Sequence, residues 1–495
     1  MQLAEFAALL GALGAVGVLV PRGGIFPLIG FVLLGTGAGG LGWWLVGRDD
    51  VELLLEDPQG IALLVVGVAA AIACAVPLAR YPPAVPVALL AVAPFRVPVQ
   101  VGDEEAFLLL PLYLVITSAV LALAYRILRG ERPAPPPFVL ALPLAAFVTF
   151  AATSFLWTWD ERAGGIALAF FVFPFTAGLA VLARSPLAGW LPRALLVTVV
   201  ALGTLFAAIG IWQAQTRTLF FGRDVEVANA YTSFFRVTSL FKDPSLYGRY
   251  LVVPIAVLLV AILLRRGRPI HWIVATGFIA FLFAGLYFSY SQSSFVALFV
   301  VTFAVAVVAA DRRTRIILLA CALGATLVAA GAAGAAIGGR SAKDVTSGRS
   351  RLVDVTLEAF QERPIAGVGI GGQPQASSEI VEKGSPSRNA SHTTPLTILA
   401  ELGVIGFALY AWLLAATAWA LYLFSRHDRA LGIGLGAILG ALVVHSFLYA
   451  GFFEDPLTWG VIGLCATALA RAPVRSTAQE PASETAPAGP ELLAH

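Results

Sequence analysis

The sequence predicts an all-α membrane protein, a polytopic bundle of about 12 to 15 transmembrane helices with two longer external loops that contain short helices. Hydrophobic residues make up 59% of the 495 residues and charged residues only 12%, whereas soluble domains are roughly one quarter charged. The mean hydropathy is +0.86. The apolar residues form continuous runs that suit helices of roughly 20 residues, not the alternating segments of a porin-type barrel. The net charge of only +3 argues against a nucleic-acid partner.

Apolar runs recur along the whole chain. They fall at about 5–20, 25–46, 60–79, 82–97, 106–125, 137–157, 164–183, 191–213, 247–264, 270–289, 293–310, 316–337, 395–424, 430–450 and 456–470. Prolines interrupt the run at 82–97, which predicts a broken or re-entrant helix there. The cysteines Cys74, Cys321 and Cys465 lie inside apolar runs, so we expect small core residues and not a disulfide or a metal site.

Charge divides the connecting loops into two sets. One set carries 13 arginines and three acidic residues, and it lies at 125–136, 184–194, 265–271, 311–315 and 425–429. The alternate short loops carry two arginines and 12 acidic residues, and they lie at 47–59, 98–105, 158–163 and 451–457. Because loops rich in arginine and lysine stay in the cytoplasm, the first set is predicted to be cytoplasmic and the second external.

This orientation divides the chain into six parts. They are the N-terminal transmembrane helices (1–213), a first external loop (214–246), the central helices (247–337), a large external loop (338–394), the C-terminal helices (395–471) and a tail (472–495). The tail is rich in Pro, Ala, Ser, Thr and Glu, which predicts a disordered segment on the cytoplasmic side.

Both longer external loops are basic, on the face where basic residues are unusual. Loops of this length are uncommon unless they have a function. The planar guanidinium group of arginine can bind two phosphate oxygens at once, so one interpretation is an anion site. The other interpretation is a solvated surface.

The large loop contains two recognisable segments. Residues 350–362 (SRLVDVTLEAFQE) have apolar residues at helical spacing, which predicts an amphipathic helix that lies on the bundle and ends before Pro364. The segment PIAGVGIGG (364–372) follows. Its glycines either let the backbone approach a ligand with free amides, or they pack in tight turns.

Three single residues are candidates on their own chemistry. Asp243 directly precedes Pro244, which predicts a helix N-cap. Arg249 lies about one turn inside the next apolar run, where an ionisable residue is either functional or extends back to the interface. His392, in SHTTPLTILAEL (391–402), is the only one of the five histidines predicted to be external. Its imidazole suits a base near neutral pH, and the alternative is a surface side chain that caps a helix.

Four segments in the same order carry a family resemblance. They are RVTSLFKDPSLYGRYL (236–251), SYSQSSFVAL (289–298), SGRSRLVDVTLEAFQERPIAGVGIGG (347–372) and SHTTPLTILAELGVIGF (391–407). Between about 234 and 424 the chain therefore resembles the O-antigen ligase and O-antigen polymerase family of polytopic membrane proteins. The first 230 residues match this family only in being hydrophobic.

The resemblance implies transfer of a glycan from an undecaprenyl-diphosphate carrier at the external face of the bacterial inner (plasma) membrane. It assigns the arginine before the Asp-Pro segment to Arg236 and the loop arginine to Arg349 or Arg351. It assigns the histidine to His392 and the glutamate to Glu401. Glu401 could orient a partner, pair with an arginine or pack within the helix.

One departure from the family pattern concerns Gln292. The family often has Ser-Arg where this chain has Ser291-Gln292, so one cation is missing. Either donor binding differs from that of the family, which leaves the donor type open, or Arg249 takes the place of the missing cation.

The residues predict a metal-independent transfer that needs no cofactor. Diphosphate leaves as a stabilised anion, so the main requirement is positive charge where the anion grows. Arg236 and Arg349 or Arg351 would supply it, and the external segments contain neither a DxD motif nor a His/Cys cluster. His392 would take the proton from the hydroxyl of a glycan, lipid or protein acceptor. Direct displacement would invert the anomeric centre.

Two rival functions stay open. A glycan polymerase or a protein O-oligosaccharyltransferase would use the same chemistry with another acceptor. A transporter of small anions or of the lipid-linked glycan would place its ionisable residues at the bilayer midplane. The middle of most predicted spans is uncharged and the candidates lie near the outer edge, which favours chemistry at the membrane surface.

Overall fold

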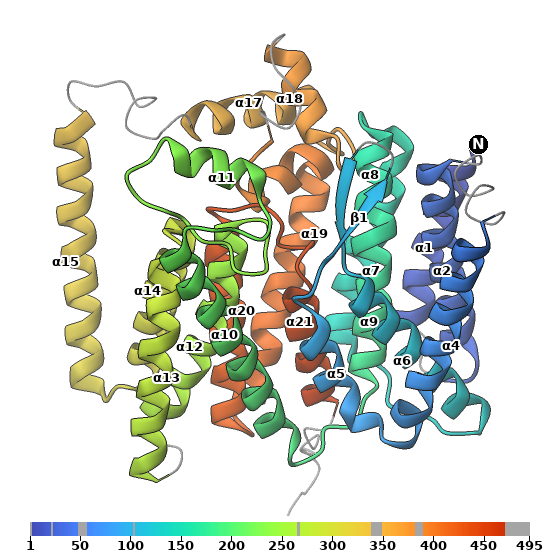
Figure 1. Ribbon diagram of the computed structural model, residues 1–495, viewed down its shortest axis with the longest axis horizontal. Coiled ribbons are helices and arrows are strands. Elements are labelled where there is room, and N and C mark those ends of the chain that lie inside the picture. Colours follow the sequence, from blue (N-terminus) through green and yellow to red (C-terminus); the bar gives the residue numbers. More distant parts are fainter. Residues whose placement is uncertain are drawn as a thin grey trace, which may run out of the picture.

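The computed structural model describes residues 2–20, 23–47, 57–101, 104–264, 268–337, 349–381 and 390–470, with side chains outside 99–106 and 325–350. These residues form an upright bundle of helices (Figure 1). The predicted tail at 472–495 lies outside the described residues. The fold class agrees with the prediction of a polytopic α-helical bundle.

Most helices have the length of a membrane span. The long ones are α2 (Phe26–Val46), α4 (Pro58–Arg80), α6 (Leu110–Leu128), α10 (Leu191–Thr216), α12 (Pro244–Leu263), α13 (Pro269–Tyr287), α14 (Gln292–Ala309), α15 (Arg312–Ile337), α19 (Thr394–Ser425) and α20 (Arg429–Ser446). Two further segments are built from shorter pieces: α7 (Phe138–Thr153) continues into η2 (Ser154–Trp157), and α8 (Glu161–Ala167), η3 (Leu168–Val172) and α9 (Phe173–Ala183) follow one another directly. The shorter apolar helices are α1 (Leu3–Leu19), α5 (Val85–Val92) with η1 (Pro82–Ala84) before it, and α21 (Pro456–Leu469).

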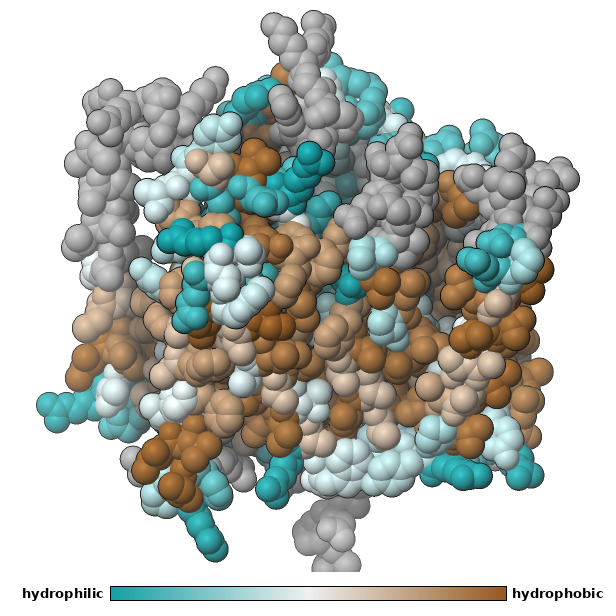
Figure 2. Space-filling view, viewed as in Figure 1, coloured by the Kyte–Doolittle hydropathy of each residue, from teal (hydrophilic) through white to brown (hydrophobic). Residues whose placement is uncertain are grey.

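The outer surface of the bundle suits a lipid solvent. Eleven described helices are long and apolar enough to cross a bilayer. In the helix Pro58–Arg80 only 11% of the most apolar window is buried, and in Pro269–Tyr287 only 17%. Figure 2 shows the exposed side chains as a broad apolar belt with hydrophilic residues at both ends. Water would penalise this much contiguous apolar surface, whereas hydrocarbon does not.

One end of the bundle carries the hairpin and the short helices that lie outside the spans, and we call it the loop face. It holds the β1–β2 hairpin and the short helices α8, α11 (Arg223–Ala230), α17 (Arg349–Glu362) and α18 (Gln373–Val381), as Figure 1 shows. The strands β1 (Val97–Val101) and β2 (Glu104–Leu108) pair antiparallel, with Val97 opposite Leu108. The loop charges alone predict only a short loop at 98–105. Its alternating valines and the Gly-Asp pair between the strands are a hairpin signal.

Aspartates begin several helices. Asp57, Asp160, Asp243, Asp428 and Asp455 each accept a backbone N–H from the first turn of the helix that follows. A carboxylate satisfies otherwise unpaired amides there and favours the positive end of the helix dipole. The N-cap predicted for Asp243 is present, with its Oδ1 2.6 Å from the amide nitrogen of Ser245.

The amphipathic helix predicted at 350–362 is α17. Its inner face buries Val355, Thr356 and Ala359. Ala359 packs with Val368 and Ala376 in a small core that is separate from the main core of the bundle. The large loop is therefore partly a folded cap on the bundle.

Candidate active site at the loop face

Arg236 is fixed by its backbone from two sides. The amide of Asn229, in α11, brackets it: the backbone nitrogen of Arg236 lies 2.9 Å from Oδ1 of Asn229, and its carbonyl oxygen lies 2.9 Å from Nδ2. The next residue, Val237, donates its amide to the carbonyl of Phe288, 3.1 Å away, after the end of α13. The half-buried guanidinium donates from Nε to the carbonyl oxygen of Ser289 over 3.3 Å. Arg236, which belongs to the segment before α12, therefore packs against the turn between α13 and α14.

Gln292 lies on the same turn. Ser291 caps α14 by accepting the amide of Ser294, and Gln292 is the first residue of that helix, with an exposed side chain. The carbonyl that Arg236 contacts belongs to Ser289, three residues earlier. Position 292, where the family often has an arginine, therefore lies on the same turn as the carbonyl that Arg236 contacts.

Arg249 lies in a buried ion pair. Its Nη1 donates to Oδ2 of Asp455 over 2.6 Å and to the carbonyl of Gly451 over 3.2 Å. The two charged side chains are 3% and 1% exposed. The helix that carries Arg249, α12, has 72% of its most apolar window buried. Loss of either partner would leave an uncompensated charge buried in the protein. The pair therefore holds α12 against the loop before α21.

His445 completes this contact from α20. Its Nδ1 lies 3.1 Å from Nη2 of Arg249, and its Nε2 lies 3.1 Å from Oγ of Ser293 and 3.3 Å from Oγ of Ser294. A guanidinium can only donate, so Nδ1 must accept, and the hydrogen-bond network assigns the ring proton to Nε2. His445 is therefore a neutral imidazole that ties α12 to the start of α14.

Arg249 has consequently committed both of its terminal nitrogens to protein partners. Within the described residues its Nε is buried and has no hydrogen-bond partner. The ring of Tyr449 lies with its centroid 5.5 Å from the guanidinium carbon, a cation–π distance. A diphosphate contact by Arg249 stays a prediction.

Glu401 holds the glycine-rich segment in place. Its carboxylate accepts backbone N–H groups from Gly371 and Gln373. The helix around it, α19, is broken at Gly403, which has φ 63° and ψ −165°. The break frees the carbonyl of Glu401, which accepts the amide of Gly369 over 2.8 Å. Of the two roles considered for the glycines, the structure shows close packing: the amides of Gly369 and Gly371 bond to Glu401 in α19, and those of Gly367 and Gly372 bond within the loop.

The segment around His392 is held from two directions. The amide of Ser391 donates to Oε1 of Gln373 over 2.9 Å, and Thr393 Oγ1 donates to the carbonyl of Phe447 over 3.3 Å. The His392 side chain itself is exposed on the loop face. Phe447 lies two residues after His445. The end of α20 at the loop face therefore contacts the His392 segment and, through His445, Ser293 and Ser294 at the start of α14.

The loop arginines lie on α17. The Arg351 side chain is exposed. The side chain of Arg349 lies outside the described residues, so the choice between the two stays open. Gln373 anchors the helix, because its Nε2 donates to Oγ1 of Thr356 over 3.3 Å. The Oε1 of the same side chain accepts the amide of Ser391.

Further polar residues lie around Arg249 at the loop face. We call Arg96, Arg249, Tyr449, Glu454 and Asp455 the polar cluster, and of these the sequence indicates only Arg249 as a candidate. The Glu454 side chain keeps some contact with solvent, but protein atoms surround its carboxyl group. This desolvation raises the pKa of the carboxyl, while the charges of Arg96 and Arg249 lower it. Glu454 in turn acts electrostatically on Glu401, which links the cluster to the glycine-rich segment.

A signal for some of these residues exists in the sequence. His445 is an ionisable residue inside a span, which by default marks a functional position. Asp455-Pro456 repeats the Asp-Pro helix start seen at Asp243-Pro244. The pairing of Asp455 with Arg249 joins residues 206 positions apart and has no local signature.

Comparison with known proteins identifies one part of this arrangement. Residues 277–411 match a family model described as O-antigen ligase. No curated protein matches the chain. The matched range includes Gln292, Arg351, His392 and Glu401, whereas Arg236 precedes it.

Proposed function

We propose that this membrane protein moves a glycan from a polyprenyl-diphosphate carrier to an acceptor hydroxyl, because residues 277–411 match a family model described as O-antigen ligase. The family match and the helical bundle support a membrane glycosyltransferase of the O-antigen ligase type. The carrier, the direction of transfer, the stereochemistry and the metal independence are the finer parts of the proposal.

The loop face is the external, periplasmic face of the inner membrane in this proposal. The charge of the connecting loops supports it, because the arginine-rich loops lie at the opposite end from the hairpin and the short helices. The C-terminus is then cytoplasmic. A donor held in the outer leaflet by its lipid would present its diphosphate and glycan to this face.

The reaction is one displacement at the anomeric carbon. The acceptor hydroxyl oxygen forms the new bond to C1 while His392 takes the hydroxyl proton. The bond from C1 to the diphosphate oxygen breaks, and the polyprenyl diphosphate leaves with the electron pair. Arg236, with Arg349 or Arg351, would stabilise the growing negative charge without a metal. A single displacement inverts the anomeric configuration.

The hydrogen-bonded path around the outer end of α20 is the observation that supports this proposal most. Thr393 contacts Phe447, His445 contacts Ser293 and Ser294, and Arg236 contacts Ser289. Segments far apart in the sequence are thereby held to one end of the bundle. Preorganised groups of this kind are what electrostatic catalysis requires.

A transporter is less well supported. The buried charged and imidazole groups lie near the loop face: Arg249 is in the second turn of α12, and His445 is the next-to-last residue of α20. A transport pathway would place such groups near the middle of the bilayer. A glycan polymerase and a protein O-oligosaccharyltransferase differ from a ligase only in the acceptor.

Reconstituted transfer tests the proposal. The purified protein in liposomes receives an undecaprenyl-diphosphate glycan and, in separate reactions, a lipid, a glycan or a peptide acceptor. His392→Ala should lower the single-turnover rate by about 10²-fold or more, since a general base contributes roughly that much. His427→Ala, at an exposed histidine on the opposite face, is the matched control and should leave the rate unchanged. Equal rates for the two variants would remove His392 from the mechanism.

A further inference from the structure

The large loop supplies hydrogen bonds that the broken helix α19 lacks. In an uninterrupted helix the amides of residues 404 and 405 would bond to the carbonyls of residues 400 and 401. The break at Gly403 separates these groups, and the segment 364–369 pairs with all four of them. With the amide named first, the bonds run from Val404 to Pro364 (2.9 Å), from Ile405 to Ile365 (3.2 Å), from Val368 to Ala400 (3.0 Å) and from Gly369 to Glu401 (2.8 Å). We call these four bonds the α19 joint.

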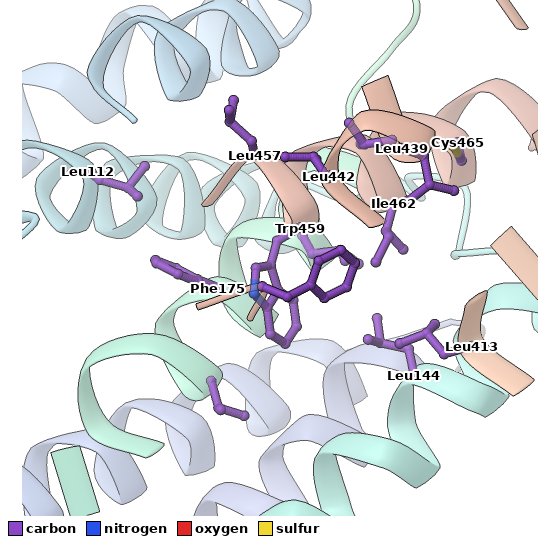
Figure 3. Packing of buried hydrophobic residues seen from close by; sticks show 14 of the residues in the cluster. Leu112, Leu144, Phe175, Leu413, Leu439, Leu442, Leu457, Trp459, Ile462 and Cys465 are labelled. Atoms are coloured by element: carbon purple, nitrogen blue, oxygen red, sulfur yellow. The ribbon is translucent and has the colours of Figure 1, made fainter. Parts of the chain in front are cut away.

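The α19 joint attaches the loop to a helix that the bundle holds in place. Below the break α19 packs in the main core, where Leu413 is fully buried and lies next to Leu144 of α7 (Figure 3). The close approach of the loop requires a glycine, since a Cβ on Gly403 would overlap the carbonyl of Ile365. The loop backbone is therefore fixed relative to the spans.

Gln373 connects the same loop to the His392 segment and to α17. Its side chain is only 1% exposed. Oε1 accepts the backbone amide of Ser391 over 2.9 Å, and Nε2 donates to Oγ1 of Thr356 over 3.3 Å and to Oγ of Ser377 over 2.8 Å. Because a backbone amide can only donate, the atom that faces Ser391 must be the oxygen, which leaves Nε2 for the two hydroxyls. One amide side chain therefore holds α17 and the residue before His392 together.

The α19 joint and Gln373 tie α17 and His392 to one frame. The backbone amide of Gln373 bonds to the carboxylate of Glu401, beside the joint. α17 ends at Glu362, two residues before the joint, and His392 lies two residues before the start of α19. A general base must lie within hydrogen-bond reach of the proton that it takes, and a displacement of about 1 Å can cost roughly 10²-fold in rate. This frame is therefore able to control the chemistry proposed for His392.

We propose that Gln373 is a positioning residue that fixes the place of His392 relative to α17, the helix that carries the loop arginines. The inference rests on the proposed function and names a residue that acts on its base. Gln373 acts through the amide of Ser391, directly before the histidine. Without the Gln373 amide group the joint still attaches the loop to α19, but the His392 segment loses its bond to this frame.

Transfer kinetics of Gln373→Met test the proposal, with Gln375→Met as the matched control. Gln375 lies on the same helix, and its side chain contacts Glu379 at the surface. Gln373→Met should lower kcat by about tenfold and leave KM for donor and acceptor within about twofold, because the base is displaced while the binding groups stay. Gln375→Met should leave kcat and KM unchanged. Equal kcat values in the two variants would overturn the proposal.

The His392→Ala background separates positioning of the base from a general structural role. If Gln373 acts through His392, adding Gln373→Met to His392→Ala should lower the residual rate by less than about twofold, because the base that Gln373 positions is already absent. A second loss of about tenfold would show that Gln373 supports the fold as a whole, and it would contradict the proposal.

A second pair of variants serves if Gln373→Met does not fold. Thr356→Val and Ser377→Ala each remove one hydroxyl that Nε2 contacts, but only Thr356 lies on α17. Thr356→Val should lower kcat in the same direction by a smaller factor, and Ser377→Ala should leave kcat unchanged. Equal kcat values in these two variants would overturn the link between α17 and the His392 segment.

Hydrogen exchange measures the link without any transfer reaction. In nanodiscs, the peptide that contains Ser391 should exchange its protected amide at least about tenfold faster in Gln373→Met than in Gln375→Met or the unchanged protein. Equal exchange would overturn the proposal even if His392→Ala abolishes transfer. Failure of the unchanged protein in transfer would contradict the proposed function, and the exchange result would then still decide whether Gln373 holds the His392 segment.

Discussion

The side chains that decide the geometry of the loop face are buried and not surface-exposed. Arg249 is contacted by Asp455, by the carbonyl of Gly451 and by His445, so that one guanidinium joins α12, α20 and the loop before α21. His445 extends the contact to α14 through Ser293. These residues position the exposed groups, and their removal should act on stability before it acts on chemistry.

Removal of one member of the buried pair should be strongly destabilising. Arg249→Met and Asp455→Asn should each lower the free energy of unfolding by about 3–5 kcal/mol, because each leaves one buried partner unpaired. Asparagine is chosen because it can still cap α21. The double variant should lose clearly less than the sum of the two. Glu131→Gln breaks the exposed pair with Arg126 and should cost at most about 1 kcal/mol.

Thermal and denaturant unfolding in detergent measures these four variants. Additive losses in the double variant would show that Arg249 and Asp455 do not interact energetically, contrary to the 2.6 Å contact.

Glu454 should make stability depend on pH. Burial raises the pKa of its carboxyl in the folded chain, so the folded chain binds the proton more tightly than the unfolded chain. Its contribution to stability is then full below the unfolded-state pKa and is lost as the pH rises through the folded-state pKa. Glu454→Gln does not titrate. Relative to the unchanged protein, this variant should therefore gain in Tm as the pH is raised from about 4 to about 8, and a constant difference would contradict the assignment.

Among the elements, the glycine-rich segment after α17 determines how the large loop is attached. Gly369 has φ +90°, and a Cβ on it would lie 2.3 Å from the Cα of Thr158. The Thr158 hydroxyl donates to the carbonyl of Ile370 over 2.8 Å. The segment is therefore packed between the α7–α8 corner and the broken part of α19, and it brings the N-terminal half of the chain to the His392 side.

Alanine substitution separates backbone strain from close packing. Gly369→Ala should cost clearly more stability than Gly130→Ala, where the glycine has a similar φ of +88° but an added Cβ meets nothing within 4 Å. The strained φ alone costs on the order of 1–3 kcal/mol, and only Gly369 adds a clash with backbone. Unfolding midpoints of the two variants, measured under the same conditions, check this. Equal losses would mean that the close approach to Thr158 is not needed.

The elements were largely predictable from local patterns, and their contacts were not. Asp243 caps α12 and the 350–362 segment forms α17, because both depend on residues a few positions apart. The sequence predicts only a loop at the hairpin, because the strands are short and lie between apolar runs. Glu401 gives no local sign that its partners are the amides of Gly371 and Gln373. The glycine pattern alone fits either ligand binding or packing, and only the break in α19 distinguishes them.

At the scale of the whole molecule, apolar length and loop charge predict the bundle and its orientation, but not which helices meet. The polar cluster takes Arg96 from the N-terminal half and Glu454 from the last loop. No pattern within either segment indicates that these residues share one space. A cavity between α5, α6, α9, α10, α12, α20 and α21 likewise arises only from the packing of these helices.

The orientation can be measured directly in cells. In a variant without Cys74, Cys321 and Cys465, a single cysteine at Ser233 should react with a membrane-impermeant maleimide in intact cells. A single cysteine at Thr314 should react only after the membrane is permeabilised. Both positions are exposed, so the difference reports the side of the membrane. Labelling of Thr314→Cys in intact cells would invert the assigned orientation and place His392 in the cytoplasm.

The most direct test of the central claim is the pH dependence of single-turnover glycan transfer by the unchanged protein and by His392→Gln. If His392 accepts the acceptor proton, the rate of the unchanged protein should rise with pH as the imidazole loses its own proton, and should then level off. His392→Gln should be slower by about 10²-fold and should lack that rise. A variant that keeps both the rate and its rise with pH would contradict the claim that His392 is the base.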